Sequence, residues 1–231
     1  MFFPERITKI GANDRVLEVG PGADPHPRSN VLLEMQYDDV TEYAKQFGHN
    51  RKLKTAAKVV FYDGREFPFK DNEFDYVICS HVLEHVPDVE FFLSELFRVA
   101  GKGYLEYPLA YYDYLYNFAV HLNFLKFKDG KMNYLKKSET SLDEFKPIND
   151  FFFQTLIKGH SKLIDDLIEK FMEGFEWDRP FRAQHVNSIL EVCHNIVDVP
   201  PIKEQSLYIF DPRRLWRRIL PLMQTKNNTQ D

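Results

Sequence analysis

The first half of the chain alternates between short apolar runs and longer segments that mix polar and apolar residues. Short apolar runs bounded by glycine, proline and acidic residues predict buried strands. These runs are Arg15–Val19, Asn30–Glu34, Lys58–Tyr62, Phe74–Ser80 and Gly103–Tyr107. Apolar residues with helical spacing follow Asp88, a suitable N-cap, and a weaker helical pattern falls within Asp39–Ala57. Strands that alternate with helices predict an α/β fold, a Rossmann-like and mostly parallel sheet with flanking helices.

The connection between the first two predicted strands is short. Only about ten residues separate Val19 from Asn30, whereas a parallel crossover usually needs a dozen or more. Pro25 and Pro27 lie within this connection. We therefore expect the first crossover helix to be reduced to a turn. The alternative is that Asn30–Glu34 is not a strand.

The second half of the chain predicts a hairpin and helices. Two β-type runs, Leu122–Phe127 and Met132–Leu135, flank Asp129-Gly130, a dipeptide that favours a type I′ turn. Ser141–Phe175 has a mostly helical pattern, with breaks expected near Pro147 and Gly159. Further β-type runs are Ile196–Val199 and Leu207–Phe210. We expect one domain over residues 1–231. Its core lies at 14–108, and residues 109–223 supply acceptor-side and lid elements and complete the sheet. Residues 224–231 form a frayed tail.

Composition and charge exclude several classes of protein. The chain is 44% hydrophobic and 28% charged, a composition typical of globular proteins. Its formal net charge is -5, and this acidic balance argues against nucleic acid as a partner. Cys79 and Cys193 are the only cysteines and form no C-x-x-C pair, so we expect a reducing cytoplasmic location. The N-terminus does not read as a signal peptide, and no apolar stretch reaches the roughly 18 residues of a spanning helix.

A glycine-containing loop follows the first predicted strand. Residues Val16 to Asp24 read V-L-E-V-G-P-G-A-D. Glycines at this place let the backbone approach a ligand at the carboxyl edge of the sheet. The dinucleotide pattern is incomplete because Pro25 holds its third glycine position, and no G-K-[ST] of a P-loop follows. The loop suits an adenosine ligand without phosphates, such as S-adenosylmethionine, although an ordinary strand-to-helix turn has the same glycines.

Two further motifs resemble those of a known protein family. Residues 67–75 read F-P-F-K-D-N-E-F-D, and residues 81–85 read H-V-L-E-H. With the glycine loop, they resemble class I S-adenosylmethionine-dependent methyltransferases of the type 11-like branch. The resemblance covers residues 14–108 and implies a Rossmann-like donor domain that binds S-adenosylmethionine. It implies methyl transfer to a small-molecule or glycan acceptor.

The resemblance also implies which residues bind the donor. These are Glu18, Gly20, Gly22, Glu34, Met35, Asp63, Gly64, Ser80 and His81. By this resemblance Glu18 organises the glycine loop, Glu34 binds the ribose and Asp63 binds the adenine. For Glu18 a purely structural role in the loop is the alternative. The third glycine of the methyltransferase loop is Asp24 here, a departure that bears on the shape of the methionine pocket.

Methyl transfer from a sulfonium needs alignment and exclusion of water, and it needs a general base only when the acceptor arrives protonated. The candidates for such a base are His81, Glu106, Tyr107 and Asp113, all on or after strands that end at the expected cleft.

Two other functions compete with methyl transfer. One is a catalytically silent binding or scaffold protein that keeps the methyltransferase fold. The other is a zinc hydrolase, because His81, Glu84 and His85 match H-x-x-E-H. That motif needs a helix, whereas here it follows a strand and precedes Pro87, and we predict no metal site.

Two aromatic or basic segments have alternative interpretations. Four tyrosines either line an acceptor pocket or belong to a packed helix: Tyr111, Tyr112, Tyr114 and Tyr116. Phe151–Phe153 form either a lid edge or part of the core, and core is the preferred interpretation. The basic amphipathic stretch at 213–220 either lies on an anionic membrane or packs on the domain, and packing is the preferred interpretation.

Overall fold

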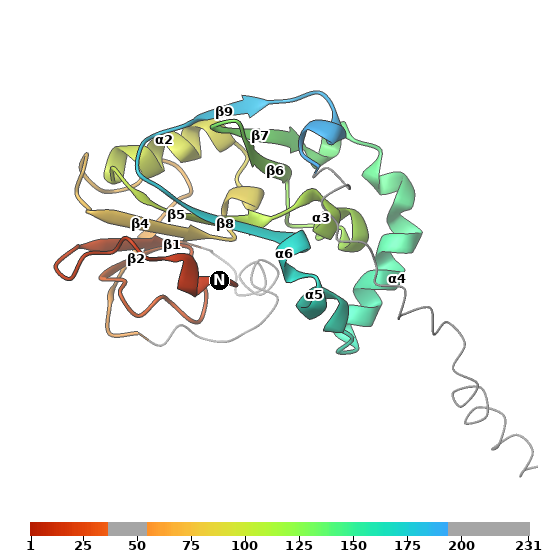
Figure 1. Cartoon of the computed structure of the whole chain (residues 1–231), viewed down its shortest axis with the longest axis horizontal. Helices are drawn as coiled ribbons and strands as arrows, with labels where there is room; N and C mark the ends of the chain where they lie inside the picture. The colour runs from red at the N-terminus through yellow and green to blue at the C-terminus, as the bar shows by residue number, and fades with distance from the viewer. Residues whose placement is uncertain (37–54, 194–231) are drawn as a thin grey trace, which may run out of the picture. The chain divides into compact units, whose positions relative to one another are not determined.

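The computed structural model describes residues 1–36 and 55–193, which belong to one compact unit, Met1–Cys193. A six-stranded sheet with the order β3-β2-β1-β4-β5-β8 forms its centre (Figure 1). Its strands are β1 (Val16–Val19), β2 (Val31–Met35), β3 (Lys58–Tyr62), β4 (Tyr76–Ser80), β5 (Gly103–Pro108) and β8 (Met172–Trp177). The first five are parallel, and β8 runs antiparallel to β5. The structure therefore confirms the predicted α/β class.

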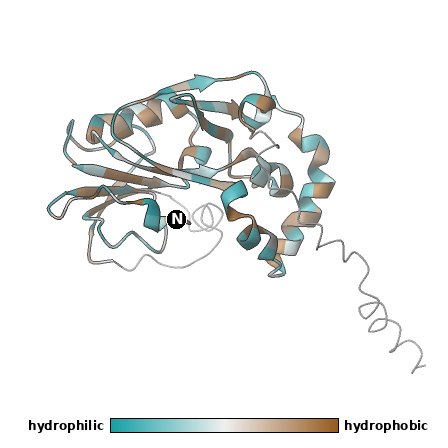
Figure 2. Ribbon diagram, in the orientation of Figure 1, coloured by the Kyte–Doolittle hydropathy of each residue, from teal (hydrophilic) through white to brown (hydrophobic). Residues whose placement is uncertain are grey.

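Burial on both faces explains why these strands read as apolar runs. Every residue of β1 and of β5 is buried, as expected for strands inside a covered sheet. Helix α2 (Val89–Val99) packs its apolar residues into the main core on one face. On the other face, Ile7 and Ile10 pack against Val16, Tyr76 and other strand residues. Figure 2 shows hydrophobic residues grouped along the central strands.

Three predictions about the first half are confirmed. The five predicted strands are present, with ends shifted by at most two residues. Asp88 caps α2, because its carboxylate accepts a hydrogen bond from Phe91 N at 2.9 Å. Residues 20–30, between β1 and β2, contain only turns and extended chain, as the short crossover predicts. The helical pattern within Asp39–Ala57 lies mostly outside the described residues.

A smaller sheet covers part of the main core. Strands β6 (Asn123–Lys128) and β7 (Lys131–Lys136) form the predicted hairpin, and β9 (Arg182–His185) runs parallel to β7. Both hairpin-turn residues, Asp129 and Gly130, have positive φ, as a type I′ turn requires. Met132 of this sheet is 0% exposed and belongs to the same core cluster as β1, β4 and α2.

Helices and short 3₁₀ turns make up the remaining described elements. The helices are α3 (Ala110–Tyr116), α4 (Lys146–Ile157), α5 (Lys162–Asp166) and α6 (Ile168–Phe171). The 3₁₀ turns are η1 (Pro4–Arg6), η2 (Leu83–His85), η3 (Lys137–Glu139), η4 (Leu142–Phe145) and η5 (Ile189–Glu191). No helix among the described residues is long and apolar enough to cross a membrane.

Some predictions for the second half are wrong at their boundaries. Residues Met172 to Phe175 belong to β8, not to a helix, because they pair with β5. The helical run does change near Pro147, where the 3₁₀ turn at 142–145 ends and α4 begins at Lys146, and proline is tolerated in this first helical turn. Phe151, expected in the core, is 65% exposed. The expected elements at 196–199, 207–210, 213–220 and 224–231 lie outside the described residues.

Candidate functional site

The glycine loop after β1 has the backbone conformation that its sequence predicts. Gly20 and Gly22 both have positive φ, 62° and 61°. A Cβ atom on Gly20 would come within 2.5 Å of Val82 Cγ2, in the segment that follows β4. The Gly20 amide also donates to the Leu33 carbonyl at 2.9 Å. Only glycine therefore fits at position 20, where the chain leaves β1 close to the ends of β2 and β4.

Glu18, on β1, accepts hydrogen bonds from two residues of the loop that follows this strand. It is 3% exposed, and its Oε2 accepts hydrogen bonds from His26 N at 2.8 Å and from Ser29 Oγ at 2.6 Å. Burial raises the pKa of Glu18 against the effect of these bonds. These contacts match the structural role that the sequence left open for Glu18.

Glu34, near the end of β2, is a buried carboxylate with few hydrogen-bond partners among residues 1–36 and 55–193. It is 6% exposed, and the hydrogen bond that it accepts comes from the adjacent Met35 N, at 3.2 Å. Burial raises the pKa of Glu34 to about 7, although this hydrogen bond opposes the shift. A carboxylate has about four acceptor positions. Glu34 therefore has spare capacity for two hydroxyl donors, and this is the property that fits a ribose diol.

The end of β3 brings Asp63 and Gly64 to the same edge of the sheet. Gly64 has a φ of 83°, and a Cβ atom there would lie 3.4 Å from Met35 Cε. Met35 is thus close to the turn after β3. The Asp63 side chain is 69% exposed and accepts a hydrogen bond from Arg65 N at 3.1 Å. Asp63 therefore lies at the same edge of the sheet as Glu34, but it is exposed whereas Glu34 is buried. The contact of Asp63 with adenine stays a prediction.

Ser80 and His81, at the end of β4, meet Glu106 of β5. Ser80 Oγ donates to Glu106 Oε1 at 2.9 Å, and His81 Nε2 lies 3.0 Å from the same oxygen. The other ring nitrogen, His81 Nδ1, lies 3.3 Å from Glu84 Oε1. Burial lowers the pKa of His81, but the two carboxylates outweigh it and raise the pKa overall. A carboxylate at each ring nitrogen favours the imidazolium form of His81, which cannot accept a proton.

Glu106 has no acceptor capacity to spare. It is 0% exposed, and the N-terminal segment reaches it through Phe2 N at 2.6 Å and Phe3 N at 3.0 Å. Tyr104 adds its hydroxyl at 2.7 Å. Burial raises the pKa of Glu106, but His81 and these donors outweigh it and lower the pKa to about 2. Such a stabilised carboxylate is a poor proton acceptor.

Tyr107 and Asp113 also have defined partners. The Tyr107 hydroxyl contacts Glu173 Oε2 and accepts from Phe127 N at 2.8 Å, and burial raises its pKa well above the usual value. Asp113, on α3, is 1% exposed and lies 2.9 Å from His121 Nδ1 and 3.3 Å from Lys137 Nζ. Of the predicted bases, the structure groups His81 with Glu106, and it places Tyr107 and Asp113 in other contacts.

The H-x-x-E-H motif does not form the helical pair of a zinc hydrolase. Residues 83–85 form a single 3₁₀ turn, η2, and His81 has a φ of 57° and lies before it. Both His81 nitrogens face carboxylates, whereas His85 Nδ1 lies 3.1 Å from the Val120 carbonyl. Burial lowers the pKa of His85. The two motif histidines therefore have different surroundings.

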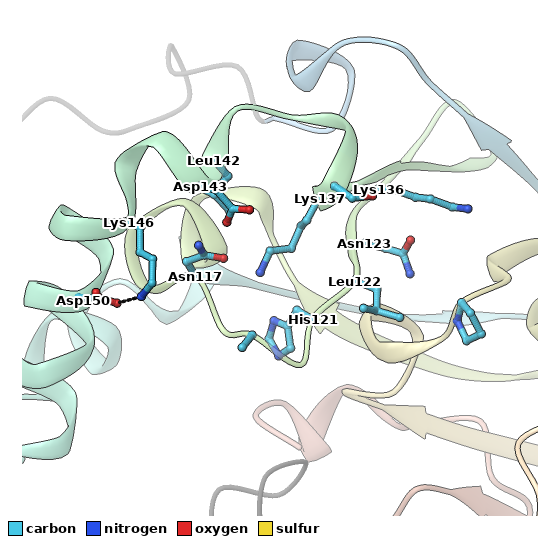
Figure 3. Close-up of a pocket in the computed structure, with 13 residues that line it drawn as sticks. Asn117, His121, Leu122, Asn123, Lys136, Lys137, Leu142, Asp143, Lys146 and Asp150 are labelled. Atoms are coloured by element: carbon cyan, nitrogen blue, oxygen red, sulfur yellow. Dashed lines mark hydrogen bonds and ion pairs between the residues drawn. The ribbon is translucent and has the colours of Figure 1, made fainter. Parts of the chain in front are cut away.

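A cavity of about 510 Å³ is lined in part by His121, whose ring centroid lies 4.8 Å from that of His85 (Figure 3). Its lining includes His121, Leu122 and Asn123 from the chain before and within β6, and Lys137 from η3. The Leu122 amide donates to the Glu84 carbonyl at 2.7 Å, so the cavity wall is tied to the segment after β4. A cavity of this size is typical of small-molecule sites.

The comparisons with known proteins agree with this architecture. Residues 29–105 match the methyltransferase domain family. The class I methyltransferase resemblance is confirmed. This methyltransferase-like chain is 29% identical over 130 residues to a demethylmenaquinone methyltransferase of Staphylococcus aureus (strain JH9), an alignment that covers 54% of the chain. The chain spans only 42% of the length of that relative.

Solved methyltransferase structures also align with part of the chain. An S-adenosylmethionine-dependent methyltransferase from Mesorhizobium loti is 14% identical, with a TM-score of 0.35, and the alignment covers 56% of this chain and 59% of that one. A second one, from Thermotoga maritima, is 20% identical, with a TM-score of 0.32 and coverage of 46% and 49%.

Sequence reasoning missed three parts of this region. It did not assign His121 or Lys137, and it did not foresee that the amides of Phe2 and Phe3 bind Glu106. Glu84 belongs to the H-x-x-E-H motif at residues 81–85, and this motif was the one sequence signal that pointed to this region. His121 had none, because its proximity to Glu84 depends on how the chain returns between α3 and β6.

Proposed function

We propose that the protein transfers a methyl group from S-adenosylmethionine to a small-molecule acceptor. The single observation that carries this proposal is Glu34, a buried carboxylate at the carboxyl edge of a parallel sheet that accepts one hydrogen bond from the part of the chain that the structure describes. The positive-φ glycines at 20 and 22 stand at the end of the adjacent strand. The match of residues 29–105 to the methyltransferase domain family supports the same conclusion.

The residues present fit this donor. When bound, S-adenosylmethionine supplies a methyl group that leaves a positively charged sulfur. Glu34 would accept hydrogen bonds from the ribose hydroxyls, and Met35 and Gly64 would pack beside the adenine. Asp63 would accept from the adenine amino group. Gly20 and Gly22 would admit the methionine part of the donor, in a loop that Glu18 holds through Ser29 and His26.

The protein contributes alignment more than proton transfer. The two carboxylates favour the imidazolium form of His81, and Glu106 already accepts hydrogen bonds from several donors, so both are poor proton acceptors in this arrangement. The proposal therefore favours an acceptor that is nucleophilic without deprotonation, or one whose proton leaves by another route. Positioning alone is a large catalytic effect.

The cavity beside Leu122 and Lys137 is the proposed acceptor site. Its volume suits a small molecule, and its wall is joined to the segment that follows β4. The Staphylococcus aureus relative is named for a small-molecule substrate, demethylmenaquinone. A glycan fragment of similar size is the other acceptor class in this proposal.

Calorimetry with S-adenosylhomocysteine tests the donor site. We expect one molecule to bind per chain, and Glu34→Gln to weaken binding at least about tenfold through loss of the charge-assisted hydrogen bonds. Glu144→Gln, an exposed glutamate in η4, is the matched control and should bind normally. Unchanged affinity in Glu34→Gln would contradict the assignment.

Donor binding without methyl transfer to any compound of an acceptor panel would favour the scaffold function.

A further inference from the structure

Glu84, His85 and His121 form a cluster that the methyl-transfer proposal does not use. Each of them offers one ligand atom, and these atoms all lie within 4.8 Å of one another. Glu84 and His85 belong to η2, immediately after β4, and His121 lies between α3 and β6. The Leu122 amide, next to His121, donates to the Glu84 carbonyl at 2.7 Å. Backbone contacts therefore hold the two segments together.

The Glu84 carboxylate is the group that needs an explanation. Its side chain is 0% exposed, and neither of its oxygens accepts a hydrogen bond from any residue that the structure describes. His81 Nδ1 and His85 Nε2 approach Oε1 only at ion-pair distances of 3.3 and 3.8 Å. His81, which also faces Glu106, compensates part of this charge at Oε1, but Oε2 has no hydrogen bond or ion pair with any described residue. A buried carboxylate oxygen in this state is costly unless a cation or a donor satisfies it.

The two histidines are oriented as metal ligands usually are. A ligating histidine generally donates its second ring N–H to a carboxylate or a backbone carbonyl. His85 Nδ1 lies 3.1 Å from the Val120 carbonyl, and His121 Nδ1 lies 2.9 Å from Asp113. These contacts account for both Nδ1 atoms. Both Nε2 atoms therefore remain available.

We propose that Glu84, His85 and His121 bind a divalent transition-metal ion, for which Zn²⁺ is the natural probe. One carboxylate and two imidazoles are a common ligand set for catalytic zinc, and three protein ligands leave a further coordination position open. Asp113 and the Val120 carbonyl act as positioning groups. His121 also lines the cavity, so the ion would lie at the cavity wall (Figure 3). This proposal does not depend on donor binding.

Titration of the full-length, tag-free protein tests the site. The protein is stripped with a chelator and titrated with Co²⁺, whose visible d–d absorption reports its coordination, and Zn²⁺ is then added as a competitor. We expect one Co²⁺ per chain, absorption typical of four or five ligands, and displacement by Zn²⁺. Glu84→Gln and His121→Ala should abolish this spectrum.

His185→Ala provides the matched control. His185 also contacts a carboxylate, Glu139, but lies on the surface away from the cluster, so the variant should bind Co²⁺ normally. Asp113→Asn should weaken Co²⁺ binding by about 10–100-fold and keep the spectrum, because it acts through His121. Circular dichroism establishes that each variant is folded. Absence of a 1:1 Co²⁺ spectrum, or an unchanged spectrum in folded His121→Ala, would overturn the proposal.

Discussion

At the scale of single residues, the protonation of Glu34 should control donor binding. Burial raises its pKa to about 7, and only the ionised carboxylate can accept from two hydroxyls. We expect affinity for S-adenosylhomocysteine to fall as pH drops from 8.5 through 7 to 5.5. In Glu34→Gln the affinity should be low and almost independent of pH. Calorimetry across this range measures both, and a parallel pH dependence in wild type and variant would contradict the assignment.

The His81 imidazolium should make stability depend on pH in a defined direction. Because the pKa of His81 is raised in the folded protein, its stabilising effect is complete below the unfolded value of 6.5 and is lost as pH rises through the folded value. The pKa of Glu106 is lowered to about 2, so its contribution is present above 4.5 and is lost only as pH falls toward 2. The His81–Glu106 pair is therefore strongest between pH 4.5 and 6.5.

His81→Gln tests this ion pair. Removing one partner of a buried pair should lower the free energy of unfolding by about 3 kcal/mol at pH 6. The difference from wild type should be smaller at pH 9, because a larger share of the His81 rings has lost its proton there. Urea unfolding at both pH values is the measurement, and His160→Gln, at an exposed position, serves as the control. An equal loss at both pH values would mean that the ring is neutral.

Individual residues differ in how far the sequence reveals their role. The positions of Gly20 and Glu34 at one edge of the sheet could be predicted because they lie at the ends of two neighbouring strand patterns, β1 and β2, whereas their contact with a donor stays a prediction. The protonation state of His81 could not, because it depends on Glu84 and Glu106, which approach the ring from separate segments. The loss of Glu106 as a base depends on contacts with residues more than 100 positions away.

At the scale of elements, the loop after β1 packs against the segment after β4, and this packing should tolerate no side chain at position 20. Gly20→Ala combines an unfavourable positive φ with a 2.5 Å contact to Val82 Cγ2. We expect a loss of about 1–3 kcal/mol in stability and weaker binding of S-adenosylhomocysteine. Adding Val82→Ala should relieve the contact and recover part of the stability. Thermal unfolding and calorimetry measure the two effects.

Gly130→Ala is the control for backbone strain alone. Gly130 has a φ of 73° in the hairpin turn, and a Cβ atom there would meet nothing within 4 Å. This variant should lose about 1 kcal/mol through its φ and bind S-adenosylhomocysteine normally. If both glycine variants lost the same stability and kept full affinity, close packing at Gly20 would not shape the donor site.

The elements that the sequence missed are those imposed by tertiary pairing. The strands β1 to β5 are bounded apolar runs, which is why their ends fall within two residues of prediction. β8 carries two glutamates, and β9 reads R-A-Q-H. Neither has a strong strand pattern of its own, and each forms because a neighbouring strand offers its free edge.

At the scale of the molecule, the two sheets should unfold together because they share one core. Met132 of β7 packs in the cluster that holds β1, β4 and α2. Met132→Ala should therefore lower the free energy of unfolding by about 2–5 kcal/mol. Native-state hydrogen exchange should show the same loss at slowly exchanging amides of β4 and of β7. Phe151→Ala, at a position 65% exposed, should leave both groups of amides unchanged.

The alternative outcome is loss of protection in β7 alone, which would make the smaller sheet an independently opening unit. The contacts argue against it. Leu125 and Met132 are both 0% exposed within the main cluster, and the hydroxyl oxygen of the β5 residue Tyr107 accepts a hydrogen bond from Phe127 N of β6 at 2.8 Å. Opening the hairpin would expose this core and break that buried hydrogen bond. The proposed acceptor cavity, bounded partly by β6 and η3, should therefore be as stable as the donor edge of the main sheet.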